Sequence, residues 1–269
     1  MPAATRARVH VRVTGGTASQ TFAPDDWSAE QVNGWVGLQK KHGIGFVFVV
    51  NGNDTPESQH EFLQRWVTAG ARLSFLEMMN EYYLGKFRDP KKVGDPDFPE
   101  VTRVVTLQDY TDSILPTYMA ALSGFGLPMF VIGAPKGPES DGWNTAIRDF
   151  LVKTRAAQPQ LGLGVTVHLY DRGAPFDYGQ LDALRGLMPS GTPIAVTECG
   201  LLDDSVKTPE ESAARHLAHD TQVLAHLVPG DYLLDQVLYS HTPLVTTLAP
   251  GGLTPKGAAV VGLFESVTP

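Results

Sequence analysis

The stretch RLSFLEMMNE, residues 72–81, carries the pattern on which the expected fold rests. It begins as an apolar run of strand composition and ends on an amide and a carboxylate, Asn80 and Glu81. Polar side chains at the end of a buried strand are costly unless they reach solvent or a partner. The stretch therefore predicts a strand whose carboxyl end opens into a cleft.

Six further runs have strand character and alternate with longer segments of helical periodicity. These strands are expected to begin at Ala7, Gly45, Pro128, Gly164, Pro193 and Gln236. Repeated strand and helix units predict a parallel sheet, and their number in 269 residues favours one α/β domain over residues 1–269, a (β/α)8 TIM-type barrel. The alternative is an open doubly wound sheet, but VTGGTASQTF, after the first strand, lacks the GxGxxG spacing of a phosphate loop.

Composition limits the classes of partner. The chain has 21 Lys and Arg against 29 Asp and Glu, a net charge of −8, so we expect no nucleic-acid partner. No apolar block has the length of a membrane span or a signal peptide, which predicts a soluble chain without a membrane partner. The sequence leaves two possibilities open for localisation: a cytoplasmic protein, or a fragment of a longer protein that is exported. It does not predict the oligomeric state. The single cysteine, Cys199, excludes an internal disulfide.

Two carboxylates end strands in this pattern. Glu81 closes the stretch quoted above, and Glu198 lies in IAVTECG, at the end of the sixth expected strand. In a barrel both would stand on the C-terminal rim, where active sites of this fold lie. Glycoside hydrolysis requires such a pair, in which one group protonates the leaving oxygen and the other attacks the sugar or activates water. Alternatively, Glu81 caps the following segment and Glu198 forms an ordinary rim ion pair.

Polar side chains alternate with apolar ones along two other strands. His168 and Tyr170 share a face of GVTVHLYD, and Tyr239 and His241 share a face of the last expected strand. Such faces, turned inward at the carboxyl end of a barrel, line an active site. The alternative for His168 is a histidine whose hydrogen bonds are satisfied within the core.

The first expected strand has the same alternation. Arg8, His10 and Arg12 oppose three valines, which fits an edge strand with one solvated face as well as a barrel strand with polar groups inside. Glu77 lies on the same strand face as Glu81. Inside the barrel Glu77 would need a cation, and Arg12 is the expected partner.

Three strand ends, MMNE, VHLY and VTECG, together resemble the clan of retaining (β/α)8 glycoside hydrolases that place acid/base and nucleophile on strands four and seven. The resemblance implies double displacement through a covalent glycosyl-enzyme intermediate, with Glu81 as acid/base and Glu198 as nucleophile. It also implies that Asn80 binds the hydroxyl next to the reacting carbon, that Tyr170 positions Glu198 and that His168 lines the pocket. The implied substrate is an oligosaccharide or glycoside, and neither a cofactor nor a metal is expected.

The chain departs from the clan at its first and last strands. If MMNE ends strand four, only two strands precede it, so the first barrel strand is absent, irregular or upstream; Arg12 then resembles the arginine that the clan often carries on strand two. The last strand lacks the tryptophan that usually floors the sugar site, and Tyr239 or His241 is expected to replace it. Trp143, at the start of a helix near the rim, is expected to be an aromatic platform for a sugar.

Two other functions fit the sequence. A non-catalytic carbohydrate-binding or assembly protein on a degenerate barrel would explain the missing strand and tryptophan. A metal-dependent hydrolase would use His168, Asp171, Glu198 and His241, although no HxH or HExxH spacing holds two ligands together. A retaining glycoside hydrolase explains the largest number of these residues and is the leading hypothesis.

Overall fold

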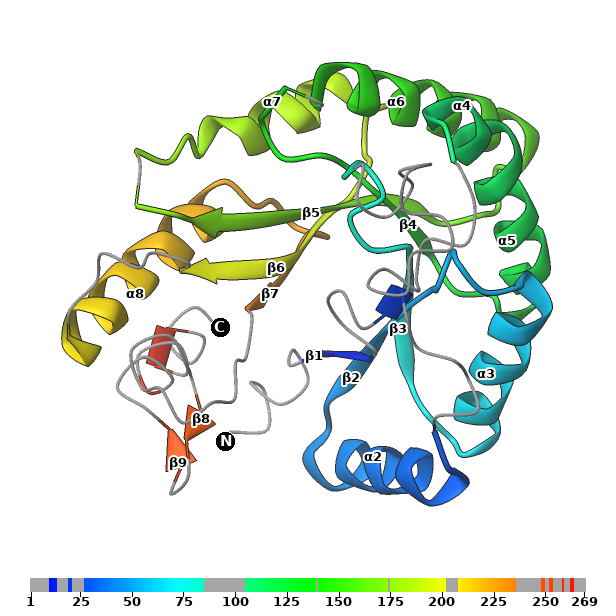
Figure 1. The fold of residues 1–269 in the computed structure, drawn as a ribbon, viewed down its shortest axis with the longest axis horizontal. Coiled ribbons are helices and arrows are strands. Elements are labelled where there is room, and N and C mark those ends of the chain that lie inside the picture. The colour runs from blue at the N-terminus through cyan, green and yellow to red at the C-terminus, as the bar shows by residue number, and fades with distance from the viewer. Residues whose placement is uncertain are drawn as a thin grey trace.

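Seven parallel strands form one sheet, and they lie in it in the order in which they occur along the chain (Figure 1). The computed structural model describes residues 10–13, 19–20, 27–84, 105–138, 140–173, 175–201, 208–235, 248–249, 252–253, 258 and 262–263. The strands are β1 His10–Val13, β2 Gly45–Val49, β3 Leu73–Met78, β4 Met129–Ile132, β5 Leu163–Asp171, β6 Ile194–Leu201 and β7 Tyr232–Asp235. A short antiparallel pair, β8 Leu248–Ala249 and β9 Gly252–Leu253, lies apart from this sheet.

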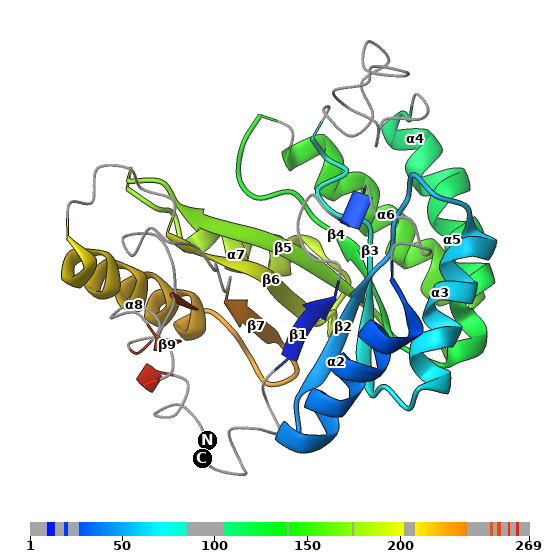
Figure 2. The same ribbon diagram turned by 60° about the horizontal axis from the view of Figure 1, so that its bottom comes forward.

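The sheet curls into a nearly closed barrel. Its strand order never reverses, which excludes a doubly wound sheet, since that fold has a reversal at its switch point. The two edge strands, β1 and β7, come side by side (Figure 2), where the rings of His10 and Tyr232 meet edge to face at 5.7 Å. The expected (β/α)8-type fold is confirmed, with seven strands in the described part of the chain.

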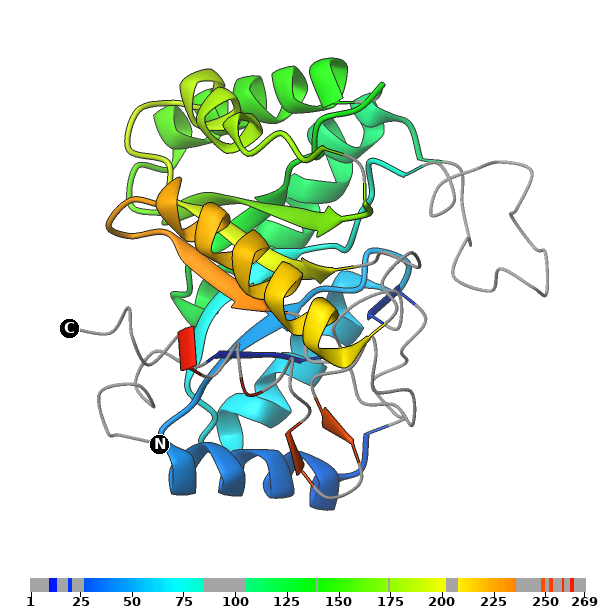
Figure 3. The same cartoon turned by 90° about the vertical axis from the view of Figure 1, so that its left-hand side faces the viewer.

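The helices lie outside the sheet, and α8 lies against β6 (Figures 1 and 3). They are α2 Ala29–His42, α3 Pro56–Thr68, α4 Leu107–Asp109, the π-helical turn η5 Tyr110–Ile114, α5 Leu115–Leu122, the 3₁₀ turn η6 Ser123–Phe125, α6 Ser140–Ala157, α7 Gly179–Leu187 and α8 Pro209–Ala225. None of the described helices is long and apolar enough to cross a membrane.

Local sequence explains where these helices begin and bend. Ser28 and Gln31 form a capping box at the start of α2, and Thr55 caps α3 just before a proline. The π-helical turn comes directly before α5, whose second residue is Pro116. A proline offers no N–H and crowds the carbonyl four residues earlier, which explains the wider turn there.

The first six expected strands correspond to β1 through β6. The seventh does not: β7 covers Tyr232–Asp235, a short apolar run that carries little alternation. The strand that we expected from Gln236 lies outside the described residues.

A small apolar layer fills the inside of the barrel. Its members are Val47, Phe75, Phe130, Ala195 and Leu234, from five strands. The rings of Phe75 and Phe130 stack at 4.3 Å with an interplanar angle of 19°. A larger apolar cluster packs between the sheet and the helices.

Gly164 makes room for the inner layer. A Cβ atom at this position of β5 would lie 2.6 Å from carbons of the Phe130 ring. Further along β5, the buried side chains of Thr166 and His168 are polar. The inside of the barrel thus changes from apolar to polar toward the carboxyl ends of the strands.

We expect Gly164→Ala to lower the free energy of unfolding by about 1–3 kcal/mol, because the added methyl group forces the Phe130 ring out of its place. The measurement is urea-induced unfolding. Gly186→Ala is the matched control: no atom lies within 4 Å of a Cβ there, and in α7 the change should stabilise by about 0.5–1 kcal/mol. A Gly164→Ala variant as stable as the wild type would contradict the packing described.

Candidate active site

The buried guanidinium of Arg12 joins three strands at the carboxyl end of the barrel. From β1, its Nε and Nη2 donate to the two carboxylate oxygens of Glu77 on β3, at 2.6 and 2.9 Å. Nη2 also donates to Oδ1 of Asn80 at 2.7 Å, and Nη1 donates to Oε1 of Glu198 on β6. The pairing of Arg12 with Glu77 that the sequence suggested is confirmed. Although β1 is an edge strand, Arg12 does not lie on a solvated face, since its side chain is 8% exposed.

His168 is buried among the carboxylates. From β5, its Nδ1 lies 3.2 Å from Oε1 of Glu81, and its Nε2 lies 3.3 Å from Oε1 of Glu77. Arg12 Nη2 is 3.4 Å from the same Nε2. The histidine is therefore part of the polar centre and is not held by core groups alone.

The charged groups of this centre shift one another's pKa values. Burial alone would raise the pKa of Glu77, but Arg12 and His168 outweigh it and lower that pKa to about 2. Burial alone would lower the pKa of His168, but Glu198, Glu77 and Glu81 outweigh it and raise that pKa to about 9. The pKa of Arg12 is raised despite burial, because Glu77 and Glu198 lie beside it. At neutral pH Glu77 is therefore paired with two cations, Arg12 and His168.

A bulge in β6 aims two consecutive side chains into the centre. The register with β5 shifts between positions 167 and 168 of β5, so that His168 lies opposite Glu198 and Thr197 is the extra residue. Thr197 Oγ1 donates to Glu77 Oε1 at 2.9 Å, while Glu198 next to it accepts from Arg12. Regular alternation would send these neighbours to opposite faces, and the bulge removes that restriction.

The turn after β3 is strained. Met79 and Glu81 have φ angles of 71° and 45°, the left-handed region that non-glycine residues seldom occupy. The buried hydroxyl of Tyr110 donates to the carbonyl of Met78 at 2.9 Å and holds the strand just before the turn. The result is that Asn80 and Glu81, although adjacent, both reach the centre.

Two tyrosines hold the carboxylates at the mouth of the centre. Tyr83 donates to Oε1 of Glu81 at 3.1 Å, and Tyr170 donates to Oε2 of Glu198 at 2.5 Å. The pKa of each phenol is raised by burial and then by the carboxylate it contacts, so both remain donors. The side chains of Glu81 and Glu198 are 17% and 11% exposed, whereas Glu77 is 0% exposed. A ligand can reach Glu81 and Glu198 but not Glu77.

Glu81, His168 and Glu198 meet at one point. A carboxylate oxygen of Glu81, a ring nitrogen of His168 and a carboxylate oxygen of Glu198 all lie within 4.8 Å of one another. Seven residues that the sequence singled out thus lie together: Arg12, Glu77, Asn80, Glu81, His168, Tyr170 and Glu198. The sequence did not indicate the part played by the Tyr83 hydroxyl, although its place two residues after Glu81 is a weak signal. It also gave no sign of Thr197.

Trp143 is not an aromatic platform. It is 2% exposed, its Nε1 donates to the carbonyl of Ile132 at 2.7 Å, and its ring stacks on Tyr110 at 5.1 Å. Both ring faces and the polar atom are therefore committed to the core. Tyr239 and His241, which were expected to floor the sugar site, lie outside the described residues.

The donor set of this centre does not fit a metal ion well. Glu81, His168 and Glu198 offer three ligand atoms, but imidazole binds a metal through an unprotonated nitrogen, and the pKa of His168 is about 9. Asp171, which the metal-dependent hydrolase would also use, instead accepts from Arg215 Nη2 at 3.1 Å. Each of the three groups also has a protein partner already: Tyr83 for Glu81, Glu77 for His168 and Arg12 for Glu198.

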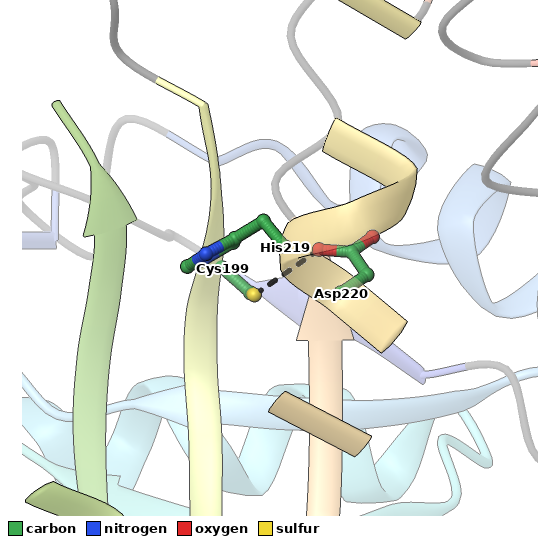
Figure 4. A group of neighbouring side chains, drawn as sticks. All are labelled: Cys199, His219 and Asp220. Atoms are coloured by element: carbon green, nitrogen blue, oxygen red, sulfur yellow. Dashed lines mark hydrogen bonds between the residues drawn. The ribbon is translucent and has the colours of Figure 1, made fainter. Parts of the chain in front are cut away.

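A second buried polar group lies between α8 and the sheet (Figure 4). Cys199 Sγ donates to Asp220 Oδ1 at 3.3 Å. The two ring nitrogens of His219 lie 3.2 Å from the carbonyl of Leu169 and 3.0 Å from the hydroxyl of Tyr178, and burial lowers the pKa of this ring. Although these atoms could be zinc ligands, both nitrogens of His219 already have protein partners. The group is best explained as a hydrogen-bond network that ties α8 to β5 and β6.

The seven parallel strands and the helices outside them define a (β/α)-type barrel with a group of carboxylates at the carboxyl ends of its strands. No protein-family model and no curated protein sequence matches the chain. Its fold is similar to the catalytic domain of a mannanase from Streptomyces sp. SirexAA-E, with a TM-score of 0.57 and 15% identity over 99% of this chain and 82% of that one.

Xylanase 10B from Thermotoga maritima is similar with a TM-score of 0.60 and 9% identity, over 96% of this chain and 86% of that one. A family 51 α-L-arabinofuranosidase from Bifidobacterium longum has a TM-score of 0.57 and 12% identity, over 92% of this chain and 61% of that one. At these identities the likeness shows a shared fold.

We expect the stabilising effect of His168 to depend on pH. Its folded-state pKa of about 9 exceeds the 6.5 of a free histidine, so the stabilisation is complete below about pH 6.5 and is lost as pH rises through about 9. The maximum effect is about 3 kcal/mol. The measurement is the difference in free energy of unfolding between wild type and His168→Gln from pH 6 to pH 10.

The exposed His42, at the end of α2, gives the matched control His42→Gln, which removes no buried ion pair. If the difference between wild type and His168→Gln stays constant across this pH range, His168 does not carry a proton in the folded state.

Proposed function

We propose that the chain is a retaining glycoside hydrolase with Glu198 as nucleophile and Glu81 as acid/base. The observation that carries the proposal is the approach of these two carboxylates to within 4.8 Å, measured between oxygens. Retaining enzymes place their carboxyl groups about 5–5.5 Å apart, whereas inverting enzymes leave about 6.5–9.5 Å for a water molecule. The likeness in fold to the mannanase and the xylanase supports a carbohydrate substrate.

Glu198 is oriented for attack. Arg12 donates to one of its oxygens and Tyr170 to the other, so the plane of the carboxylate is fixed before a sugar arrives. Such preorganisation lowers the cost of reaching the transition state. In the first step Glu198 forms a bond to the sugar carbon while the bond from that carbon to the leaving oxygen breaks.

Glu81 has the surroundings of a group that gives and takes a proton. Tyr83 and His168 both contact its Oε1, which fixes the carboxyl group. Glu81 gives its proton to the leaving oxygen in the first step, and the cationic His168 stabilises the carboxylate that results. In the second step the carboxylate takes a proton from the water that releases the sugar from Glu198.

Asn80 is the proposed contact for the hydroxyl next to the reacting carbon. Its Oδ1 accepts from Arg12, which turns the amide and makes Nδ2 the donor for a sugar hydroxyl. A non-catalytic carbohydrate-binding protein is the second candidate, favoured by the finding of seven barrel strands in the described part of the chain, where the clan has eight. It predicts sugar binding without turnover.

The proposal is tested by covalent trapping. Incubation with a panel of 2-deoxy-2-fluoro glycosides that carry a good leaving group should add one sugar to the wild type, and peptide mapping should place it on Glu198. Glu198→Gln should take no label and lose turnover. Glu210→Gln, an exposed acid in the first turn of α8, is the matched control and should label like the wild type.

A label on another residue, or turnover that survives Glu198→Gln, would remove Glu198 from the role assigned. Sugar binding with neither label nor turnover across the panel would favour the binding protein.

A further inference from the structure

Arg172 stands at the mouth of the centre without a polar partner. It is exposed and directly follows β5, and its guanidinium carbon lies 5.9 Å from the ring centre of Tyr170. It makes no hydrogen bond and no ion pair with any described residue. Of the seven other described arginines, Arg72 also lacks a side-chain polar partner, and side-chain donors bind polar groups at the remaining six: Arg12, Arg65, Arg148, Arg155, Arg185 and Arg215.

The acid next to Arg172 is engaged elsewhere. Asp171 accepts from Arg215 on α8 at 3.1 Å, so it is turned toward the helix layer and does not neutralise its neighbour. If Arg172 served only to keep the protein soluble, we would expect it to form an ion pair with this neighbouring acid. At the end of β5, Asp171 therefore contacts Arg215, whereas the guanidinium of Arg172 lies over the ring of Tyr170.

Arg172 contacts one of the tyrosines that hold the mouth carboxylates, and its charge affects the other. Tyr170, under the guanidinium, donates to Glu198, so a single side chain separates Arg172 from Glu198. The positive charge also acts on Tyr83, the donor to Glu81, where it opposes the effect of burial on the phenol pKa. Arg172 therefore stacks on the donor to Glu198 and acts by its charge on the donor to Glu81.

The other cations of the centre are not free to bind an anionic ligand. Arg12 and His168 are buried and already contact Glu77, Glu198 and Glu81. The donors of Arg172 have no partner among the described residues, so they can bind an anionic group of a ligand.

We propose that Arg172 binds the carboxylate of a uronic acid, which makes the substrate an acidic glycoside. The inference rests on the proposed function and names its substrate class. A guanidinium presents a planar pair of donors that matches a carboxylate, and it can do so while its face lies on an aromatic ring. A merely structural role for Arg172, cation–π contact with Tyr170, would affect neutral and acidic sugars alike.

The test uses a pair of ligands that differ only at C6, methyl β-D-glucuronide and methyl β-D-glucoside. Dissociation constants are measured by saturation-transfer NMR titration, with the 4-methylumbelliferyl β-D-glucuronide and β-D-glucoside assayed for hydrolysis in parallel. The wild type should bind the glucuronide about 10-fold more tightly than the glucoside or better, and Arg172→Gln should remove that preference while changing glucoside binding less than 2-fold.

Arg72→Gln is the matched control, because Arg72 is also exposed, has no side-chain polar partner among the described residues and lies at the amino end of β3. Arg72→Gln changes the net charge by the same amount as Arg172→Gln, and it should leave the preference for the glucuronide unchanged. No preference in the wild type, or a preference that survives Arg172→Gln, overturns the inference. If the protein binds the glucuronide preferentially but hydrolyses neither glycoside, the inference stands and the proposed function is contradicted. If it hydrolyses them without preferring the glucuronide, the proposed function stands and the inference is overturned.

Discussion

The ion pair between Arg12 and Glu77 is the interaction on which the rest of this barrel depends. Both side chains are buried, and each would be very costly to bury alone. Arg12 also contacts Asn80 and Glu198, so one guanidinium connects β1, the end of β3 and β6. The same contacts hold a barrel wall together and orient the group that we propose as nucleophile.

The three carboxylates of the centre divide into two kinds. Glu77 is fully buried, keeps a pKa of about 2 and serves as a fixed counter-ion for Arg12 and His168. Glu81 and Glu198 are partly exposed and each is held by a tyrosine, which leaves them accessible to a ligand. The degree of burial thus separates the carboxylate that organises the site from the two that we propose as catalytic groups.

Much of this could be predicted from the sequence, because it depends on strand periodicity. Alternation brought His168 and Tyr170 to one face, and strand ends marked Glu81 and Glu198. What could not be predicted depends on contacts between distant segments. The hydrogen bond from Trp143 to Ile132 put that ring in the core, although its place after a Gly- and Pro-rich loop resembled a rim position.

The backbone irregularities could not be predicted from the sequence either. The left-handed conformations of Met79 and Glu81 occur without glycine, and no residue type in β6 indicates the bulge at Thr197. Both bring a side chain into the centre that regular alternation would turn away. The strained turn persists because surrounding groups, such as Tyr110 on the Met78 carbonyl, hold it.

The most direct measurement of the central claim is a double-mutant cycle on Arg12 and Glu77, with urea-induced unfolding of Arg12→Gln, Glu77→Gln and the double variant. Each single change leaves a buried charge uncompensated and should cost about 3–5 kcal/mol. In the double variant Glu81 and Glu198 still face His168, so the combined loss should fall short of the sum by about 2 kcal/mol or more. Losses that add without coupling would contradict the claim that this ion pair organises the barrel and its site.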